Sequence, residues 1–126
     1  MLRARFDHVG IVVKDIDAAT SFLKGMLGFT LEREIDITGR LTAAILRSGE
    51  ARVELIEVVA DAPQAARPRD HFAFEVDDLS DALVVLRQAG VVTTREEPSL
   101  VGGARSFFTE AASTGGMTLQ IFDRSR

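Results

Sequence analysis

The chain contains two histidines, His8 and His71, which stand at matching places in two similar segments. Each segment reads as a strand near a histidine, followed by an acidic turn into a helix, and the histidines lie 63 positions apart. Two polar residues of later strands, Glu54 and Gln120, lie 66 positions apart. Imidazole nitrogens with carboxylate and amide oxygens suit a divalent ion such as Mn, Co, Ni, Zn or Fe(II). The four side chains therefore predict a metal site that leaves room for water or substrate.

The elements that must position these side chains form two copies of a β-α-β-β-β unit. In the first copy we expect strands over residues 6–13, 29–34, 41–47 and 51–59, with a helix that is capped by Asp15 or Asp17 and ends at Gly28. In the second copy we expect strands over residues 71–76, 91–97, 105–109 and 117–122, with a helix that is capped by Asp78 or Ser80 and ends at Gly90. One helix per unit covers one sheet face. The predicted fold is α+β, with two tandem βαβββ modules forming a cupped, incomplete barrel-like sheet and the helices outside.

The length of 126 residues predicts one domain. Its first module would span residues 1–60 and its second module residues 69–126. The linker over residues 61–68 contains Pro63 and Pro68, which favour irregular structure.

Strand alternation places the four candidate ligands on the cavity side of the sheet. A carboxylate such as Glu54 that points into a cup costs several kcal/mol unless an ion or a donor compensates it. A metal ion is one solution. A polar core network, with Arg52 or Arg105 as the compensating cation, is the other.

Composition limits the classes of binding partner and the cellular location that we expect for the protein. A net charge of −4 without a run of basic residues gives no reason to expect nucleic acid or an anionic membrane as partner. The absence of cysteine excludes disulfides and thiolate chemistry, and it suits a reducing cytoplasm. We see no signal peptide and no apolar run of about 18 residues, so a cytoplasmic protein is expected.

Motifs over most of the chain resemble the vicinal oxygen chelate superfamily, which includes glyoxalase I, methylmalonyl-CoA epimerase, extradiol dioxygenases and the bleomycin- and fosfomycin-resistance proteins. The segments that carry the resemblance are 6–13, 22–29, 53–57, 71–78 and 113–120. The resemblance implies metal ligands at His8, Glu54, His71 and Gln120, the positions that the repeat had selected. It also implies a homodimer.

Within the superfamily the chain looks most like the epimerases, with three departures. Those enzymes usually carry a proton-transferring glutamate where this chain has Gln120, and an amide cannot act as a base. The connection from Glu54 to His71 also looks shorter, and Asp36 and Thr38 stand where a second base is expected.

Two other carboxylates are catalytic candidates. Glu54 could act as both ligand and base. Glu75 follows His71 by four positions, so it shares that strand face, although a solvated strand-end carboxylate is its alternative interpretation. The loops 36–40 and 98–104 stand at matching places and could form a lid, with Gly102 and Gly103 as a hinge; a plain hairpin connection is the alternative.

Two functions follow from this pattern. The first is a metal-dependent isomerase, epimerase or lyase that acts on a carbonyl substrate through a metal-stabilised enolate. The alternative is a protein that binds and sequesters a small, antibiotic-like molecule in the same cavity, which the amide of Gln120 favours. An Fe(II) dioxygenase is disfavoured, because such enzymes resemble a site with glutamate at that position. The expected partner is a small molecule in each case, and no residue can be assigned to substrate binding from the sequence.

Overall fold

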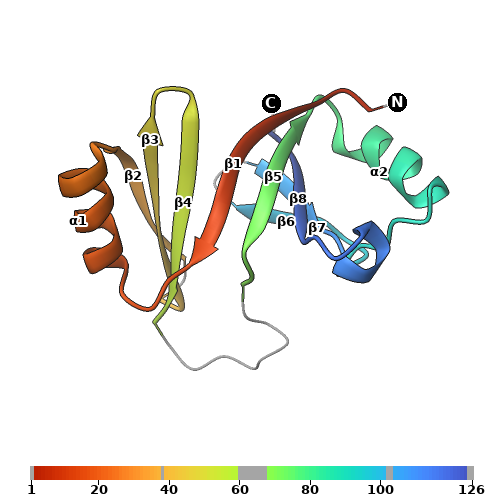
Figure 1. Cartoon of the computed structure of the whole chain (residues 1–126). Coiled ribbons are helices and arrows are strands. Elements are labelled where there is room, and N and C mark those ends of the chain that lie inside the picture. The colour runs from red at the N-terminus through yellow and green to blue at the C-terminus, as the bar shows by residue number, and fades with distance from the viewer. Residues whose placement is uncertain (1, 38, 60–67, 102–103, 125–126) are drawn as a thin grey trace. The chain divides into compact units, whose positions relative to one another are not determined.

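The computed structural model describes residues 2–37, 39–59, 68–101 and 104–124. The first module contains β1 (Ala4–Val12), α1 (Ile16–Leu27), β2 (Thr30–Ile37), β3 (Leu41–Ser48) and β4 (Ala51–Val58) (Figure 1). The second contains β5 (His71–Val76), α2 (Leu79–Gln88), β6 (Ser99–Val101), β7 (Ala104–Phe108), a short 3-10 helix (Ala111–Thr114) and β8 (Leu119–Arg124). The α+β class and the repeated β-α-β-β-β order are therefore confirmed.

The chain divides into two compact units. The N-terminal unit comprises His8–Asp70, and the C-terminal unit comprises His71–Arg126 together with Met1–Asp7, the segment in which β1 begins. The strand order is β2-β3-β4-β1 in the N-terminal unit and β5-β8-β7-β6 in the C-terminal unit. In each unit the first strand of the module pairs in parallel with the last, and the other pairs are antiparallel.

Helix α1 begins after Asp15, one of the two caps that the sequence offers, and ends at the predicted Gly28. The Asp15 carboxylate accepts a hydrogen bond from the Ala18 N–H, and Gly28 closes the helix with a φ of 74°, a conformation that glycine adopts without strain. Helical spacing in the sequence predicts a core stripe of Ala19, Phe22, Leu23 and Met26. The structure differs, because Phe22 and Met26 are exposed. The residues that contact the sheet core are Ile16, Ala19 and Leu23, with Leu46 and Leu55 on the sheet side.

A carboxylate of the last strand fixes the start of the helix in each unit. Glu57 Oε1 accepts a hydrogen bond from the Ile16 N–H at 2.7 Å, and Asp123 Oδ2 accepts one from the Leu79 N–H at 2.8 Å. The positive end of the helix dipole adds to both contacts. Glu57 and Asp123 lie 66 positions apart, the same offset as Glu54 and Gln120, so the repeat extends to the residues that attach each helix to its sheet.

Asp123 also holds an arginine. Its carboxylate accepts hydrogen bonds from Arg105 Nε at 3.1 Å and Nη2 at 2.6 Å, and its side chain is buried. The hydrogen bond and negative charge of Asp123 raise the pKa of the Arg105 guanidinium. One buried carboxylate thus connects β7, β8 and the first turn of α2.

The segment 91–97 is not the strand that the sequence predicted. Thr93 makes an isolated bridge to Thr109, and the first strand after α2 is instead β6, inside the region predicted as a loop. The Thr93 hydroxyl donates to the Arg95 carbonyl at 2.8 Å. Such local bonds compete with a strand ladder, and Pro98 offers no backbone N–H to one.

Two further predictions fall largely outside the described residues. These are most of the linker 61–68 and the glycine pair proposed as a lid hinge, Gly102 and Gly103. Among the described helices, none is long and apolar enough to cross a membrane.

We expect Asp123→Ala to lower the free energy of unfolding by about 2–3 kcal/mol, because a buried helix N–H loses a charged acceptor. Urea denaturation followed by circular dichroism measures the change. Asp77→Ala is the matched control, since Asp77 makes an exposed ion pair with Arg5 at 3.1 Å, and it should change stability by less than about 0.5 kcal/mol. Equal effects of the two substitutions would contradict a structural role for Asp123.

Candidate functional site

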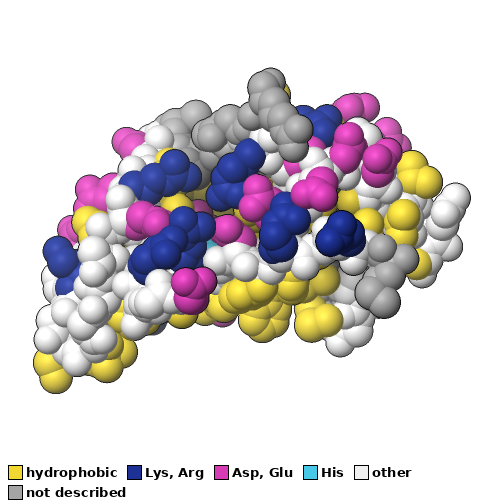
Figure 2. Space-filling view, turned by 90° about the horizontal axis from the view of Figure 1, so that it is seen from above, with side chains coloured by type: hydrophobic (Ala, Val, Ile, Leu, Met, Phe, Trp, Pro, Cys, Tyr) yellow, Lys and Arg dark blue, Asp and Glu magenta, His cyan; other side chains and the backbone are white. Residues whose placement is uncertain are grey.

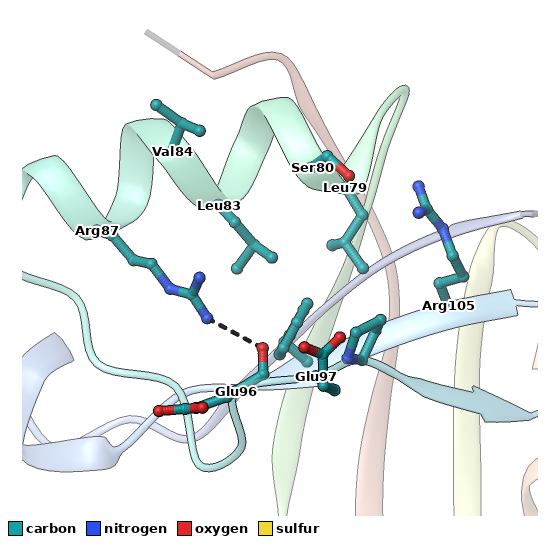
Figure 3. A pocket seen from close by; sticks show the side chains of 10 residues that line it. Leu79, Ser80, Leu83, Val84, Arg87, Glu96, Glu97 and Arg105 are labelled. Carbon is teal, nitrogen blue, oxygen red and sulfur yellow. Dashed lines mark hydrogen bonds between the residues drawn. The ribbon is translucent and has the colours of Figure 1, made fainter.

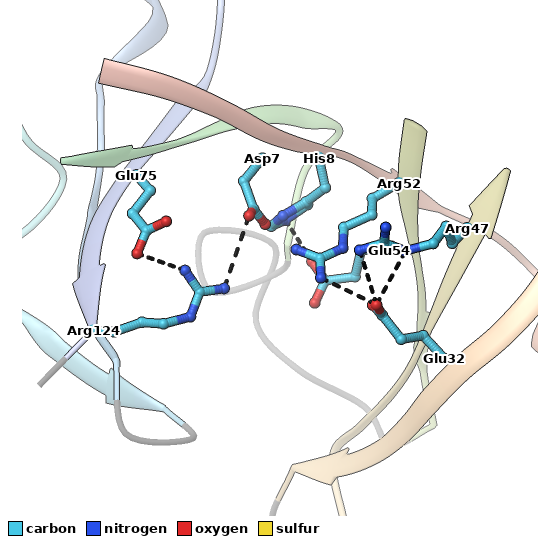
Figure 4. Close-up of polar contacts among 8 residues, drawn as sticks. All are labelled: Asp7, His8, Glu32, Arg47, Arg52, Glu54, Glu75 and Arg124. Carbon is cyan, nitrogen blue, oxygen red and sulfur yellow. Dashed lines mark hydrogen bonds and ion pairs between the residues drawn. The ribbon is translucent and has the colours of Figure 1, made fainter. Parts of the chain in front are cut away.

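In the N-terminal unit, His8 and Glu54 lie on one face of adjacent strands. Strand β1 runs parallel to β4 with Gly10 opposite Glu54, and His8 precedes Gly10 by two residues, so both side chains point to the same side. Their closest atoms, His8 Nε2 and Glu54 Oε1, are 3.5 Å apart, and both side chains are largely shielded from solvent (Figure 4). This face is opposite to the one that packs against α1.

In the C-terminal unit, His71 and Gln120 repeat this arrangement. Strand β5 runs parallel to β8 with Ala73 opposite Gln120, and His71 precedes Ala73 by two residues. Gln120 is also opposite Phe108 of β7, and the His71 ring meets the Phe108 ring edge to face with centroids 5.2 Å apart. His71 and Gln120 therefore share the sheet face that points away from α2.

The two strand pairs have the same register. In each unit the histidine stands two residues before the residue that pairs with the second candidate ligand. The sequence offsets of 63 and 66 positions thus correspond to equivalent places in two sheets. The structure brings together His8 with Glu54, and it places His71 and Gln120 on a common face.

The His8–Glu54 pair fits two ligands of one metal ion. Two ligand atoms at about 2.0–2.2 Å from a tetrahedral ion are separated by about 3.3–3.6 Å. The observed 3.5 Å between Nε2 and Oε1 falls in that range and is long for a hydrogen bond. Nitrogen and oxygen donors without sulfur suit the divalent ions Mn, Co, Ni, Zn and Fe(II).

A cluster of two arginines and one glutamate lies on the same face of the N-terminal unit. We call it the Glu32 cluster: Glu32 Oε1 accepts from Arg52 Nη2 at 3.0 Å and from Arg47 Nε at 3.3 Å, and Arg47 Nη2 lies 3.2 Å away (Figure 4). Burial of the Glu32 carboxylate would raise its pKa, but the hydrogen bond and charge of Arg52, helped by Arg47, outweigh burial. The pKa of Glu32 therefore lies below its ordinary value of 4.5.

Sequence reasoning missed this cluster. It offered Arg52 as a compensating cation for Glu54, but it did not identify Glu32 as a partner of Arg52. A β-bulge between Leu31 and Arg33 displaces the simple alternation of β2. The sequence did indicate that Arg52 lies on the same sheet face as Glu54, because the two residues are two positions apart on one strand.

Glu75, the second catalytic candidate, is held by an arginine. Arg124 Nη1 lies 2.7 Å from Glu75 Oε2, and Arg124 Nη2 lies 3.8 Å from Asp7 Oδ1 (Figure 4). Glu75 shares the sheet face of His71, as its spacing predicts. The structure therefore gives this carboxylate a partner on β8, which the sequence did not identify.

A hollow of about 400 Å³ lies elsewhere in the C-terminal unit, between α2 and the segment before β6 (Figure 3). Phe107 and Arg105 line it from β7, and Arg87 of α2 crosses its mouth to the Glu96 carbonyl at 3.5 Å. These β7 side chains point to the helix side of the sheet, whereas Phe108 and Gln120 point to the other side. The hollow is therefore separate from the candidate site.

Charged side chains of both signs are interspersed on the face seen in Figure 2, and no large patch of one sign stands out there. This mixture agrees with the modest net charge of −4.

The chain matches the family model described as the Glyoxalase/Bleomycin resistance protein/Dioxygenase superfamily over residues 5–124. It is 30% identical to the uncharacterized protein YwbC of Bacillus subtilis (strain 168), covering 95% of this chain and 98% of the relative. It is 24% identical to the mitochondrial methylmalonyl-CoA epimerase of Homo sapiens, covering 93% and 72%. Methylmalonyl-CoA epimerase from Mycobacterium tuberculosis has a similar fold, with a TM-score of 0.82, 24% identity and coverage of 96% and 88%.

The lowered pKa of Glu32 predicts a pH-dependent contribution to stability. The contribution is present above the ordinary glutamate pKa of 4.5 and is lost as the pH falls through the lower pKa of the folded state. We therefore expect Glu32→Gln to be less stable than the natural chain at pH 7, with the gap shrinking toward pH 3. Urea denaturation of both proteins from pH 7 to pH 3 measures this gap. A gap of constant size would contradict an ionised, arginine-paired Glu32.

Proposed function

Because the chain belongs to the Glyoxalase/Bleomycin resistance protein/Dioxygenase superfamily, we propose that it is a metal-dependent enzyme of the vicinal oxygen chelate type. The reaction would be isomerisation, epimerisation or a lyase reaction on a small carbonyl compound. The observation that best supports this proposal is the repeated register, which gives each unit a histidine and a second donor on one sheet face. The similarity to methylmalonyl-CoA epimerases favours proton removal next to a carbonyl group.

In this proposal His8, Glu54, His71 and Gln120 hold one divalent ion of Mn, Co, Ni, Zn or Fe(II). The 3.5 Å separation of the first two donor atoms supports it. When bound, such an ion supplies positive charge that stabilises an enolate oxygen. Gln120 contributes a neutral oxygen, so the donor set carries one negative charge fewer than a set with two glutamates.

The proton is moved by this chain's own carboxylates. Glu54 is the leading base, because it is the carboxylate among the four donor residues and lies beside the imidazole of His8. Glu75 is a second catalytic candidate on the face of His71, where Arg124 fixes its position at 2.7 Å. Gln120 cannot take a proton, so it orients and binds only.

A non-catalytic role is the second candidate. The amide of Gln120, at the place where epimerases usually have a glutamate, favours a protein that binds and sequesters a small molecule in the same cavity. A homodimer and a cytoplasmic location remain predictions for either function.

We expect the protein purified without chelators to hold about one divalent ion per chain, measured by plasma mass spectrometry. His8→Ala and His71→Ala should each weaken metal affinity by more than about tenfold, because each removes a donor. Asp77→Ala, in an exposed ion pair outside the candidate ligands, should leave the affinity unchanged. Failure to bind Mn, Co, Ni or Zn in near-stoichiometric amount would overturn the metal-dependent function.

We expect the metal-loaded protein to exchange the proton next to the carbonyl of its substrate for deuterium. A panel of small 2-oxo acids and methylmalonyl-CoA in deuterium oxide, followed by proton NMR, tests this expectation. Glu54→Gln should slow exchange by about 10²–10⁴-fold, because the amide keeps a ligand oxygen but loses the base. Ligand binding that survives EDTA and His71→Ala, without exchange of any panel member, would support the sequestering role instead.

A further inference from the structure

The Glu32 cluster contains two arginines and one glutamate. Arg47 and Arg52 bring two guanidinium groups to one carboxylate, Glu32, whose lowered pKa keeps it ionised at neutral pH. The Arg52 side chain is only 26% exposed and its Nε is buried, so its charge is less screened by solvent than that of a surface arginine. The cluster therefore places a largely shielded arginine, Arg52, on the sheet face that also carries Glu54.

Arg52 lies close to one of the candidate metal ligands, Glu54. Arg52 and Glu54 are alternate residues of β4, so their side chains leave the same face about 7 Å apart. On β3, Arg47 is opposite Arg52 and Ile45 is opposite Glu54, which continues the face across the next strand. If the carbonyl of a substrate lies beside Glu54, a second group of that substrate, a few carbon atoms from the carbonyl, would reach Arg52.

The geometry of the arginine pair leaves a role for another anion. Glu32 contacts both arginines through one oxygen, Oε1. An arginine binds a carboxylate most strongly when two of its N–H groups donate to the two oxygens in parallel. A ligand carboxylate can adopt that two-point geometry on Arg52, while Arg47 continues to hold Glu32.

We propose that Arg52 binds a carboxylate of the substrate and thereby selects carbonyl compounds that carry a negative group beyond the reacting centre. This inference rests on the proposed metal-dependent function. Gln120 is consistent with it, because a neutral ligand leaves more positive charge at the site for a more negative substrate to neutralise.

Two 2-oxo acids of equal carbon number test the inference. Both 2-oxoglutarate and 2-oxopentanoate offer the same pair of neighbouring oxygens to a metal, and only 2-oxoglutarate carries a second carboxylate. Their dissociation constants are measured by calorimetry on the Mn-loaded protein. We expect 2-oxoglutarate to bind about tenfold more tightly or better, since the additional contact is a charge-assisted hydrogen bond.

Substitutions with opposite expected effects on the preference for 2-oxoglutarate test whether Arg52 binds the ligand or has only a structural role. Arg52→Gln should remove most of the preference for 2-oxoglutarate, and Arg52→Lys should leave an intermediate preference because lysine lacks the two-point geometry. Glu32→Gln should increase the preference, since it removes the competing carboxylate. Arg87→Gln removes the same charge from α2 of the other unit and is the matched control, with no expected effect on the preference.

The outcomes distinguish this inference from the function on which it rests. Equal binding of the two acids, an unchanged preference in Arg52→Gln, or a reduced preference in Glu32→Gln would overturn the role of Arg52 alone. A protein that binds neither Mn nor either acid would overturn the proposed function and this inference together.

Discussion

The candidate site depends on the register of two parallel strand pairs. Gly10 opposite Glu54 and Ala73 opposite Gln120 place each histidine on the same sheet face as the second candidate donor of its unit. A slip of one residue in either pair would turn one donor toward the helix side of the sheet, because side chains alternate along a strand. The apolar residues on the helix side, such as Ile11 and Leu55, resist such a slip, since it would expose them to solvent.

Each helix is attached to its sheet by the same strand that carries the second candidate donor. Glu57 and Asp123 accept from the first turn of their helices, three residues beyond Glu54 and Gln120. Odd spacing sends the two side chains of each strand to opposite faces. Strands β4 and β8 therefore couple the candidate site on one face to helix packing on the other, and Arg105 extends the second attachment to β7.

The repeated register and the helix starts could be predicted from the sequence, because alternation and capping are local properties of the chain. The prediction of a strand over 91–97 was wrong, since Thr93 makes a local hydrogen bond and Pro98 lacks a backbone N–H, and a count of apolar residues shows neither. The exposure of Phe22 was also unexpected. Helical spacing predicts a stripe, but only packing against the sheet decides which edge of the stripe is covered.

By itself the sequence determined the α+β class and the two βαβββ modules, and it selected the candidate donor residues. Each follows from hydrophobic periodicity or from a repeat, and both patterns can be identified in the sequence without a structure. Tertiary structure alone decided which charged groups meet: Arg52 with Glu32, Arg124 with Glu75, and Arg105 with Asp123. An ion pair between distant residues depends on strand pairing and on bulges, and neither leaves a fixed spacing in the sequence.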